Sequence, residues 1–143
     1  MILLDTGPLV ALFDPADDSH RPCVETLRTI VEPLGTTIPV LTEAFHLLSP
    51  GSNGATNLIH FIADSGLALW FLDPQTMERA FELMQQYADH PMDLADASLV
   101  AMAESENLHK IFTIDRSDFA AYRIKRGHRL RAFELIEPAR TRK

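Results

Sequence analysis

Four short apolar runs, separated by stretches with helical periodicity, constrain the fold of this chain more than any other feature of its sequence. The runs cover residues 2–4, 36–41, 67–72 and 110–114. The first is too continuous for a half-exposed strand and is typical of a central parallel strand covered on both faces. Strands that alternate with helices imply right-handed crossovers. We therefore expect a three-layer α/β/α fold with a mostly parallel central sheet of four to five strands.

The stretches between these runs carry helix signals. Pro8 is suited to begin a helix, Ser19 and Thr42 can act as N-caps, and Pro39 places its strand near an edge or at a strand end. An edge strand is expected over residues 129–136. The expected helices cover residues 9–13, 20–31, 43–48, 74–88, 93–106 and 118–122, with another around residues 58–62.

The motif Asp5-Thr6-Gly7, directly after the first run, is compatible with two kinds of protein. An aspartic protease half-site reads Asp-Thr-Gly after an apolar strand, and a metal-dependent nuclease places its first ligand at the end of strand one. A protease half-site needs further β-strands after the motif. Here Pro8 begins a helical pattern and the chain remains rich in helices, so we reject the protease interpretation.

Four acidic residues are expected to meet at one edge of the sheet. Asp5 ends the first strand, and Glu43 follows the second at the start of a helix. Asp96 lies in the first turn of a helix that is apolar nearly all round, and Asp115 ends the fourth strand. Ligands of open α/β sheets bind beyond the carboxyl ends of the strands. Carboxylates packed there repel unless a cation neutralises them, so we expect Mg²⁺ or Mn²⁺, which prefer oxygen ligands.

Each of these acids also has a purely structural explanation. Asp5 can be a turn former, although a carboxylate at the end of a central strand needs a partner, which favours a functional role. Glu43 can serve only as a first-turn acid on the helix dipole. Asp93 and Asp96 have N-cap and N3 spacing, so Asp93 is most simply the cap while Asp96 projects inward. Asp115 can cap the turn after it, and Asp118 is expected to cap the short helix that follows. The combination of acids favours a site more than any single one does.

Charge is distributed unevenly along the chain. The net charge is −7, which disfavours a nucleic-acid partner, because attraction to phosphate needs positive surface. Nine of the thirteen Lys and Arg, however, lie in residues 116–143, beside three acids. This basic segment either faces a polyanion or is an ordinary solvated part of the domain.

Cysteine usage and hydropathy indicate the compartment. The single Cys23 cannot form an internal disulfide, which favours a reducing compartment. Cys23 and His20 are helix neighbours and are not expected to bind zinc. The start has no basic signal-peptide region, and no stretch approaches the ~18 apolar residues of a membrane span. We expect one cytoplasmic domain over residues 1–143, including the basic segment, without membrane association.

Four segments together resemble the PIN-domain family, in its VapC-type toxin branch. They follow the family's order and spacing almost from end to end, and they cover residues 2–12, 42–44, 93–101 and 112–119. The resemblance implies a PIN fold, an Mg²⁺- or Mn²⁺-dependent ribonuclease acting on RNA, inhibition by a VapB-type antitoxin, and a homodimer. The apolar helices at residues 58–62 and 77–84 offer surface for a second copy or for an antitoxin helix.

The family's functional residues map onto individual positions of this chain. Its acidic quartet is matched by Asp5, Glu43, Asp96 and Asp115. The first, third and fourth of these are the expected metal ligands, and Glu43 completes the ligand set or orients the attacking water. Thr6 matches a small hydroxyl residue that often stands beside the first acid of the family. Asp93 matches an acid that is present in part of the family and assists there. Arg116 and Asp118 are auxiliary candidates, Arg116 as a phosphate contact or as a charge that balances nearby acids.

Two rival interpretations stay open. A non-catalytic PIN-like module would bind RNA or a protein without turnover, although a copy that has lost activity is expected to lose an acid of the quartet. A phosphatase or receiver-like domain with Asp5 as phosphoacceptor would want a second Asp at position 7, where this chain has Gly. His46, one turn after Glu43, either touches substrate or is a partly buried helix residue, and we favour the latter.

Overall fold

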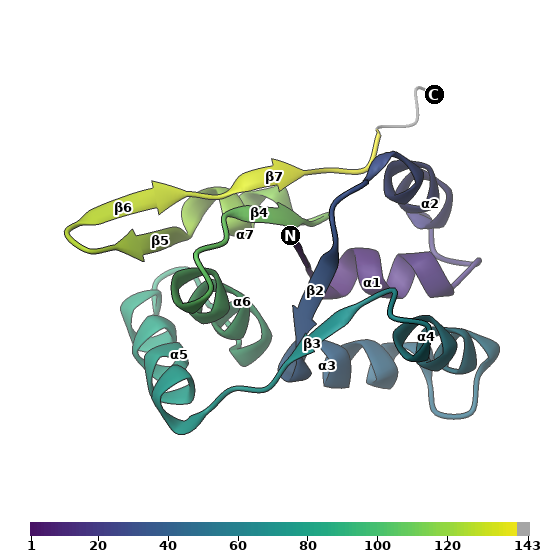
Figure 1. The fold of residues 1–143 in the computed structure, drawn as a ribbon, viewed down its shortest axis with the longest axis horizontal. Helices are drawn as coiled ribbons and strands as arrows, with labels where there is room; N and C mark the ends of the chain where they lie inside the picture. Colours follow the sequence, from purple (N-terminus) through teal and green to yellow (C-terminus); the bar gives the residue numbers. More distant parts are fainter. Residues whose placement is uncertain (140–143) are drawn as a thin grey trace.

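A five-stranded sheet forms the centre of the computed structural model, which describes residues 1–139 (Figure 1). Its strands follow the order β3-β2-β1-β4-β7, and every neighbouring pair is parallel. Leu3 and Leu4 of β1 and Ile111 and Phe112 of β4 are fully buried, as expected for central strands covered on both faces. The strands are β1 (Ile2–Leu4), β2 (Leu34–Thr37), β3 (Ala68–Trp70), β4 (Lys110–Phe112) and β7 (Glu134–Ile136).

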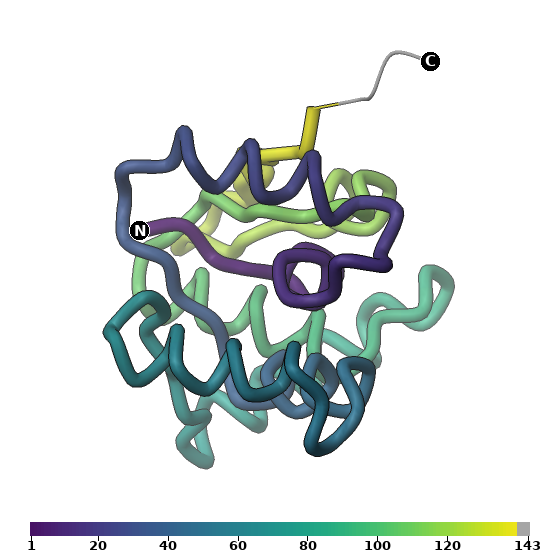
Figure 2. The backbone as a smooth tube through the Cα atoms, turned by 90° about the vertical axis from the view of Figure 1, so that its right-hand side faces the viewer, coloured from purple at the N-terminus to yellow at the C-terminus, as the bar shows by residue number. Residues whose placement is uncertain are grey.

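Helices flank the sheet on both sides, which confirms the predicted α/β fold. Figure 1 shows α1, α2 and α4 to the right of the central strands and α5 and α6 to the left. Figure 2, which views the molecule from the right, shows α2 above and α4 below α1. The helices are α1 (Thr6–Phe13), α2 (His20–Thr29), α3 (Ile38–Leu48), α4 (Asn53–Ala63), α5 (Pro74–Gln86), α6 (Leu94–Ser105) and α7 (Arg116–Ala121). No helix in the described part of the chain is long and apolar enough to cross a membrane.

The predicted strand over residues 36–41 was wrong from residue 38 onward. The internal strand β2 ends at Thr37, and α3 begins at once, with Pro39 in its first turn. Proline fits there because the first helical N–H groups have no intrahelical partner. Thr42 therefore does not cap a helix but donates a hydrogen bond to the carbonyl of Ile38 within α3 (2.9 Å). As a result Glu43 lies in the second turn of α3, not at a helix start.

The boundaries of two short helices were also predicted wrongly, and both errors concern acids. Helix α1 begins at Thr6 with Asp5 as its N-cap, before the predicted start after Pro8. Helix α7 begins at Arg116 with Asp115 as its N-cap, so Asp118 lies in the first turn and is not the cap. Asp5 directly follows β1, and Asp115 lies three residues after the end of β4, so both carboxylates lie at the carboxyl edge of the sheet.

The predicted strand over residues 129–136 is two strands that belong to different sheets. Strand β6 (Arg129–Ala132) pairs antiparallel with β5 (Arg123–Arg126), a strand that the sequence pattern did not predict. Phe133 then turns inward against Phe119, and β7 joins β4 as the edge strand of the main sheet. Arg140, Arg142 and Lys143, part of the expected basic segment, lie outside the described residues.

Candidate active site

An acidic cleft of about 490 Å³ lies beyond the carboxyl ends of β1 and β4. The structure places all four acids of the expected quartet in its wall, together with the auxiliary candidates Asp93 and Asp118. Asp17 also lines the cleft and was not predicted from the sequence. No Lys, Arg or His is among the described residues that line it. Its seven carboxylates are Asp5, Asp17, Glu43, Asp93, Asp96, Asp115 and Asp118.

Asp5 is the most deeply placed of these carboxylates. Its residue is only 7% exposed, and both carboxylate oxygens are held: Oδ1 accepts from the backbone N–H of Thr6 (2.8 Å) and Oδ2 from the hydroxyl of Thr113 (2.9 Å). Burial, with smaller contributions from the charges of Glu43 and Asp93, raises the pKa of Asp5 to about 6, although these two hydrogen bonds oppose the rise. The side chain is therefore fixed in direction, and its ionised form needs a positive partner.

Thr113 links two acids of the cleft and was not singled out from the sequence. Its fully buried hydroxyl donates to Asp5 and accepts from the backbone N–H of Asp115 (3.1 Å). Because Thr113 directly follows β4, it ties the end of that strand to the end of β1. The only sequence signal was a hydroxyl residue two positions before Asp115.

Asp96 is held by a tyrosine that comes from a distant part of the chain. The Tyr122 hydroxyl donates to Asp96 Oδ2 (3.1 Å), and the Tyr122 ring is buried edge-on against Tyr87 and Phe119. Burial raises the pKa of Asp96 to about 8, and the charges of Asp93 and Asp5 add to the rise. Burial and the Asp96 charge also raise the pKa of Tyr122 above its usual range, so the hydroxyl stays a hydrogen-bond donor.

Asp93 is the N-cap of α6, as the spacing predicted. Its Oδ1 accepts from the backbone N–H of Asp96 (2.8 Å). The residue is exposed at the rim of the cleft. Its carboxylate thus contributes negative charge to the site while one oxygen is engaged in capping.

Asp115 and Asp118 form a pair on α7 with opposite tendencies to hold a proton. Burial of Asp115 is outweighed by hydrogen bonds from Ser117 (2.8 Å to Oδ1) and from Asp118, so the pKa of Asp115 lies below its ordinary value. Burial raises the pKa of Asp118, and the Asp115 carboxylate adds to the rise, although a contact with His90 Nε2 (2.6 Å) opposes it. Asp115 therefore gives up its proton more readily than Asp118 does.

The remaining predicted residues lie at different distances from the centre of the site. Glu43 is half-buried and lines both the acidic cleft and a neighbouring apolar groove. Thr6 lines the cleft, and its buried hydroxyl has no hydrogen-bond partner within residues 1–139. Arg116 is exposed, lies 3.6 Å from Glu137 and is absent from the cleft wall. His46 is exposed and lines the apolar groove, so the expectation that it is partly buried was wrong.

The donor set of the cleft fits a hard divalent cation that keeps part of its water shell. Its oxygens are carboxylates and hydroxyls with no Cys or His among the lining residues, which suits Mg²⁺ or Mn²⁺ better than zinc. Within residues 1–139, no three Asp, Glu, His or Cys side chains form a ready-made metal-binding group. Mg²⁺ typically binds through one or two carboxylates and several waters, and the unpartnered hydroxyl of Thr6 can bond such a water.

Comparison with models of known families matches residues 2–125 to the PIN domain. The chain belongs to the PIN-domain family. Among curated proteins, this PIN protein is 26% identical to Ribonuclease VapC26 of Mycobacterium tuberculosis over 124 residues, which covers 85% of this chain and 92% of the relative. It is therefore related to the VapC toxin ribonucleases of toxin–antitoxin systems, as the sequence resemblance predicted.

Solved structures support the PIN fold. The sarcin–ricin loop cleaving toxin VapC20 of Mycobacterium tuberculosis has a TM-score of 0.73 and 19% identity, covering 82% of this chain and 94% of that one. A toxin–antitoxin complex from Klebsiella pneumoniae has a TM-score of 0.64 and 21% identity, with 85% and 92% covered. VapBC2 of Rickettsia felis, bound to a promoter DNA fragment, has a TM-score of 0.63 and 17% identity, with 96% and 98% covered.

Proposed function

We propose that this PIN-domain protein is an Mg²⁺- or Mn²⁺-dependent endoribonuclease and the toxin of a VapBC-type pair. The observation that carries the proposal is the acidic cleft, in which the quartet Asp5, Glu43, Asp96 and Asp115 lies at the carboxyl edge of a parallel sheet. The relation to VapC ribonucleases supports the choice of RNA as substrate. A non-catalytic binding module would not need two buried carboxylates whose ionised forms lack a counter-charge.

The residues of the cleft have separable roles in the proposed hydrolysis. Asp5, Asp96 and Asp115 would hold the cation, each directed by a hydrogen-bond donor: Thr113, Tyr122 and Ser117, respectively. When bound, the cation lowers the pKa of a coordinated water and neutralises charge on the attacked phosphate. Glu43, which no recorded hydrogen bond within residues 1–139 engages, completes the ligand set or orients the attacking water. Asp93 and Asp118 add negative charge, and Thr6 contributes a free hydroxyl.

The test is cleavage of a panel of structured RNAs that includes a sarcin–ricin stem-loop, with Mg²⁺ or Mn²⁺ and with EDTA. Wild type is expected to cut in a metal-dependent manner, while Asp5→Asn and Asp96→Asn lose cleavage. Asp64→Asn, an exposed change at the end of α4 outside the cleft wall, is the matched control and should retain it. Equal cutting by wild type and the cleft variants would indicate a contaminant, and absence of cutting together with absence of metal binding would overturn the mechanism.

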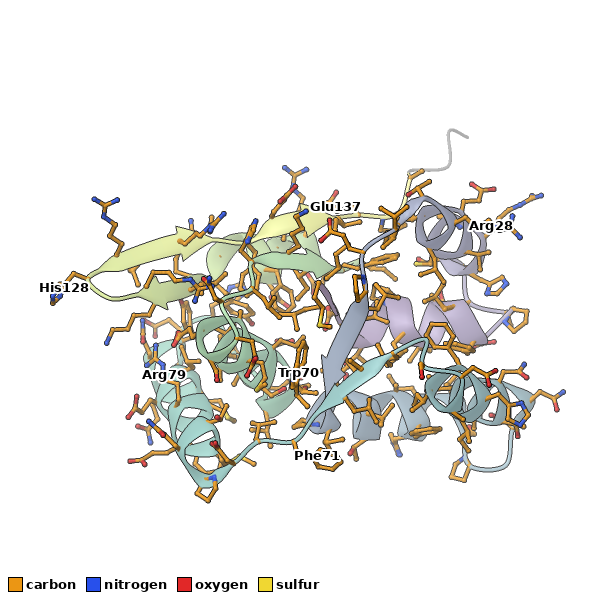
Figure 3. The ribbon with its side chains drawn as sticks, in the orientation of Figure 1. Arg28, Trp70, Phe71, Arg79, His128 and Glu137 are labelled. Carbon is orange, nitrogen blue, oxygen red and sulfur yellow. The ribbon has the colours of Figure 1, made fainter. Side chains whose placement is uncertain are left out.

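We also propose that the protein forms a homodimer in the cytoplasm and binds a VapB-type antitoxin. Solved structures with the same fold include a toxin–antitoxin complex. An apolar groove of about 790 Å³ adjoins the acidic cleft, and Phe71 at its edge is 77% exposed (Figure 3). Light scattering of wild type and Phe71→Asp is the test, because an interface at this groove predicts that only the variant is monomeric.

A further inference from the structure

The hairpin of β5, β6 and their turn, residues 123–132, carries the densest positive charge of the described structure. We call it the basic hairpin. It contains no Asp or Glu, and His128 lies at its tip (Figure 3). Its Lys and Arg residues are Arg123, Lys125, Arg126, Arg129 and Arg131. Figure 1 shows it extending beyond α6, away from β2 and β3.

The basic hairpin is anchored to α6, although an isolated two-stranded hairpin is only marginally stable. Ile124 is fully buried, and the Arg126 guanidinium donates to the carbonyls of Ala103 (2.9 Å), Glu104 (3.3 Å) and Leu108 (2.8 Å). The carbonyls of Ala103 and Glu104 lie in the last turn of α6, where a cation is favoured by the helix dipole, and that of Leu108 lies in the loop that follows. Arg126 is thus used to fix the hairpin in place, and the hairpin is a rigid arm.

Three other cations of the hairpin have no partner in the described structure. Lys125, Arg129 and Arg131 are exposed, and their side chains take part in no recorded ion pair or hydrogen bond within residues 1–139. In the strand register Arg129 lies directly opposite Arg126. Like charges directly opposite each other destabilise a sheet. This arrangement therefore costs stability in the free protein and favours an anionic partner.

The hairpin begins at the rim of the acidic cleft. Tyr122, whose hydroxyl binds Asp96, immediately precedes β5, and β5 then follows α6 as far as Ala103. Asp96 and Ala103 are seven residues apart on α6, or about 10 Å along its axis at 1.5 Å per residue. At a rise of about 3.4 Å per nucleotide along a duplex, this corresponds to roughly three nucleotides.

We infer that the basic hairpin binds phosphates of the RNA substrate roughly three nucleotides from the bond that is cleaved; the inference rests on the function proposed above. The cleft itself repels RNA, because its wall holds seven carboxylates and the whole chain has a net charge of −7. Attraction of the RNA must therefore come from another surface of the protein, which lies close enough to the cleft to bind the same RNA strand. Exposed Arg and Lys side chains position a nucleic acid through its phosphates without reading its sequence.

The experiment compares two double variants that remove the same charge. Arg129→Gln/Arg131→Gln removes two of the five positive charges of the hairpin, and Arg21→Gln/Arg28→Gln removes two exposed positive charges of α2. Binding of a fluorescein-labelled RNA stem-loop is followed by fluorescence anisotropy in EDTA over a range of salt concentrations. The hairpin variant should bind roughly tenfold more weakly, and the slope of log affinity against log salt should become shallower by about 1.4–1.8 for two lost phosphate contacts. The α2 variant should bind like wild type.

Four results decide between the possibilities. In cleavage assays with Mg²⁺, a higher KM with unchanged kcat in the hairpin variant supports the inference, because positioning energy is lost equally in ground and transition states. RNA affinities that are equal in the two double variants would overturn it. If wild type binds RNA but never cleaves it, and the hairpin variant loses binding, the RNA-binding role of the hairpin is supported and the proposed ribonuclease function is overturned. Competition by poly-glutamate as strong as by RNA would assign the surface to an acidic protein and overturn the inference.

Discussion

Removing one carboxylate from the acidic cleft should stabilise the metal-free protein at alkaline pH. In the folded protein, burial and the neighbouring acids raise the pKa of Asp96 from 3.8 to about 8. Below about pH 4, Asp96 is protonated in both the folded and the unfolded chain, and its contribution to stability is fully present. As pH rises from about 4 to about 8, the unfolded chain releases this proton while the folded chain keeps it. Folding is therefore progressively penalised across this range.

The magnitude follows from the separation of the two pKa values. A difference of about four pKa units at 1.36 kcal/mol each is roughly 5 kcal/mol. Asp96 is only partly buried, and water in the open cleft lessens both the cost of its burial and the repulsion from its neighbours, so we expect about 2 kcal/mol at pH 8. Asp96→Asn keeps the shape and the hydrogen bond from Tyr122 but cannot ionise. For a chain of this size, ~2 kcal/mol corresponds to a Tm about 4–8 °C higher than that of wild type.

The assay is thermal unfolding followed by circular dichroism in EDTA at pH 4 and pH 8, with Asp64→Asn as the control. The Tm of Asp96→Asn should be higher than that of wild type at pH 8 and equal to it at pH 4. Added Mg²⁺ should reduce the difference in Tm at pH 8, because it stabilises wild type. A variant no more stable than wild type at pH 8, or a difference of the same size at both pH values, would refute the reasoning.

Three further predictions concern single contacts. Thr113→Val removes the hydroxyl that joins Asp5 to the backbone of Asp115, and RNA cleavage should fall roughly 10–100-fold, measured as kcat/KM. Tyr122→Phe keeps the buried ring but loses the bond to Asp96; Mn²⁺ affinity, measured by calorimetry, should fall roughly tenfold. Gly35→Ala would place a methyl group 2.5 Å from the Trp70 ring, so urea unfolding should show a loss of about 1–3 kcal/mol and altered tryptophan fluorescence.

The parallel sheet, and the meeting of four acids at its carboxyl edge, could be predicted from short apolar runs that end in acids. Asp5 comes directly after β1, and Asp115 comes three residues after β4. In a parallel sheet such positions meet at one edge. Asp96 could be placed because Asp93 gave a clear N-cap three residues earlier. These signals involve residues close together in sequence, so they can be recognised without the structure.

Other parts of the structure depend on contacts that a local pattern does not contain. Thr113 and Asp5 are 108 residues apart in sequence, and Tyr122 and Asp96 are 26 apart, so neither hydrogen bond has a local signal. The segment around Pro39 was predicted as a strand because short apolar runs do not distinguish strands from buried helices, whereas in the structure it begins α3. Strand β5 was missed because Ile124 is its only fully buried residue and charged side chains surround it.

The central claim is that the acidic cleft holds the divalent cation required for RNA cleavage. Its most direct test is the anomalous difference density of crystals grown with Mn²⁺, collected for wild type and for Asp96→Asn. We predict a peak in the cleft within bonding distance of Asp5, Asp96 or Asp115 in wild type, directly or through water, and a weaker peak or none in the variant. A wild-type crystal with ordered Mn²⁺ only outside the cleft, or with none at saturating Mn²⁺, would contradict the claim.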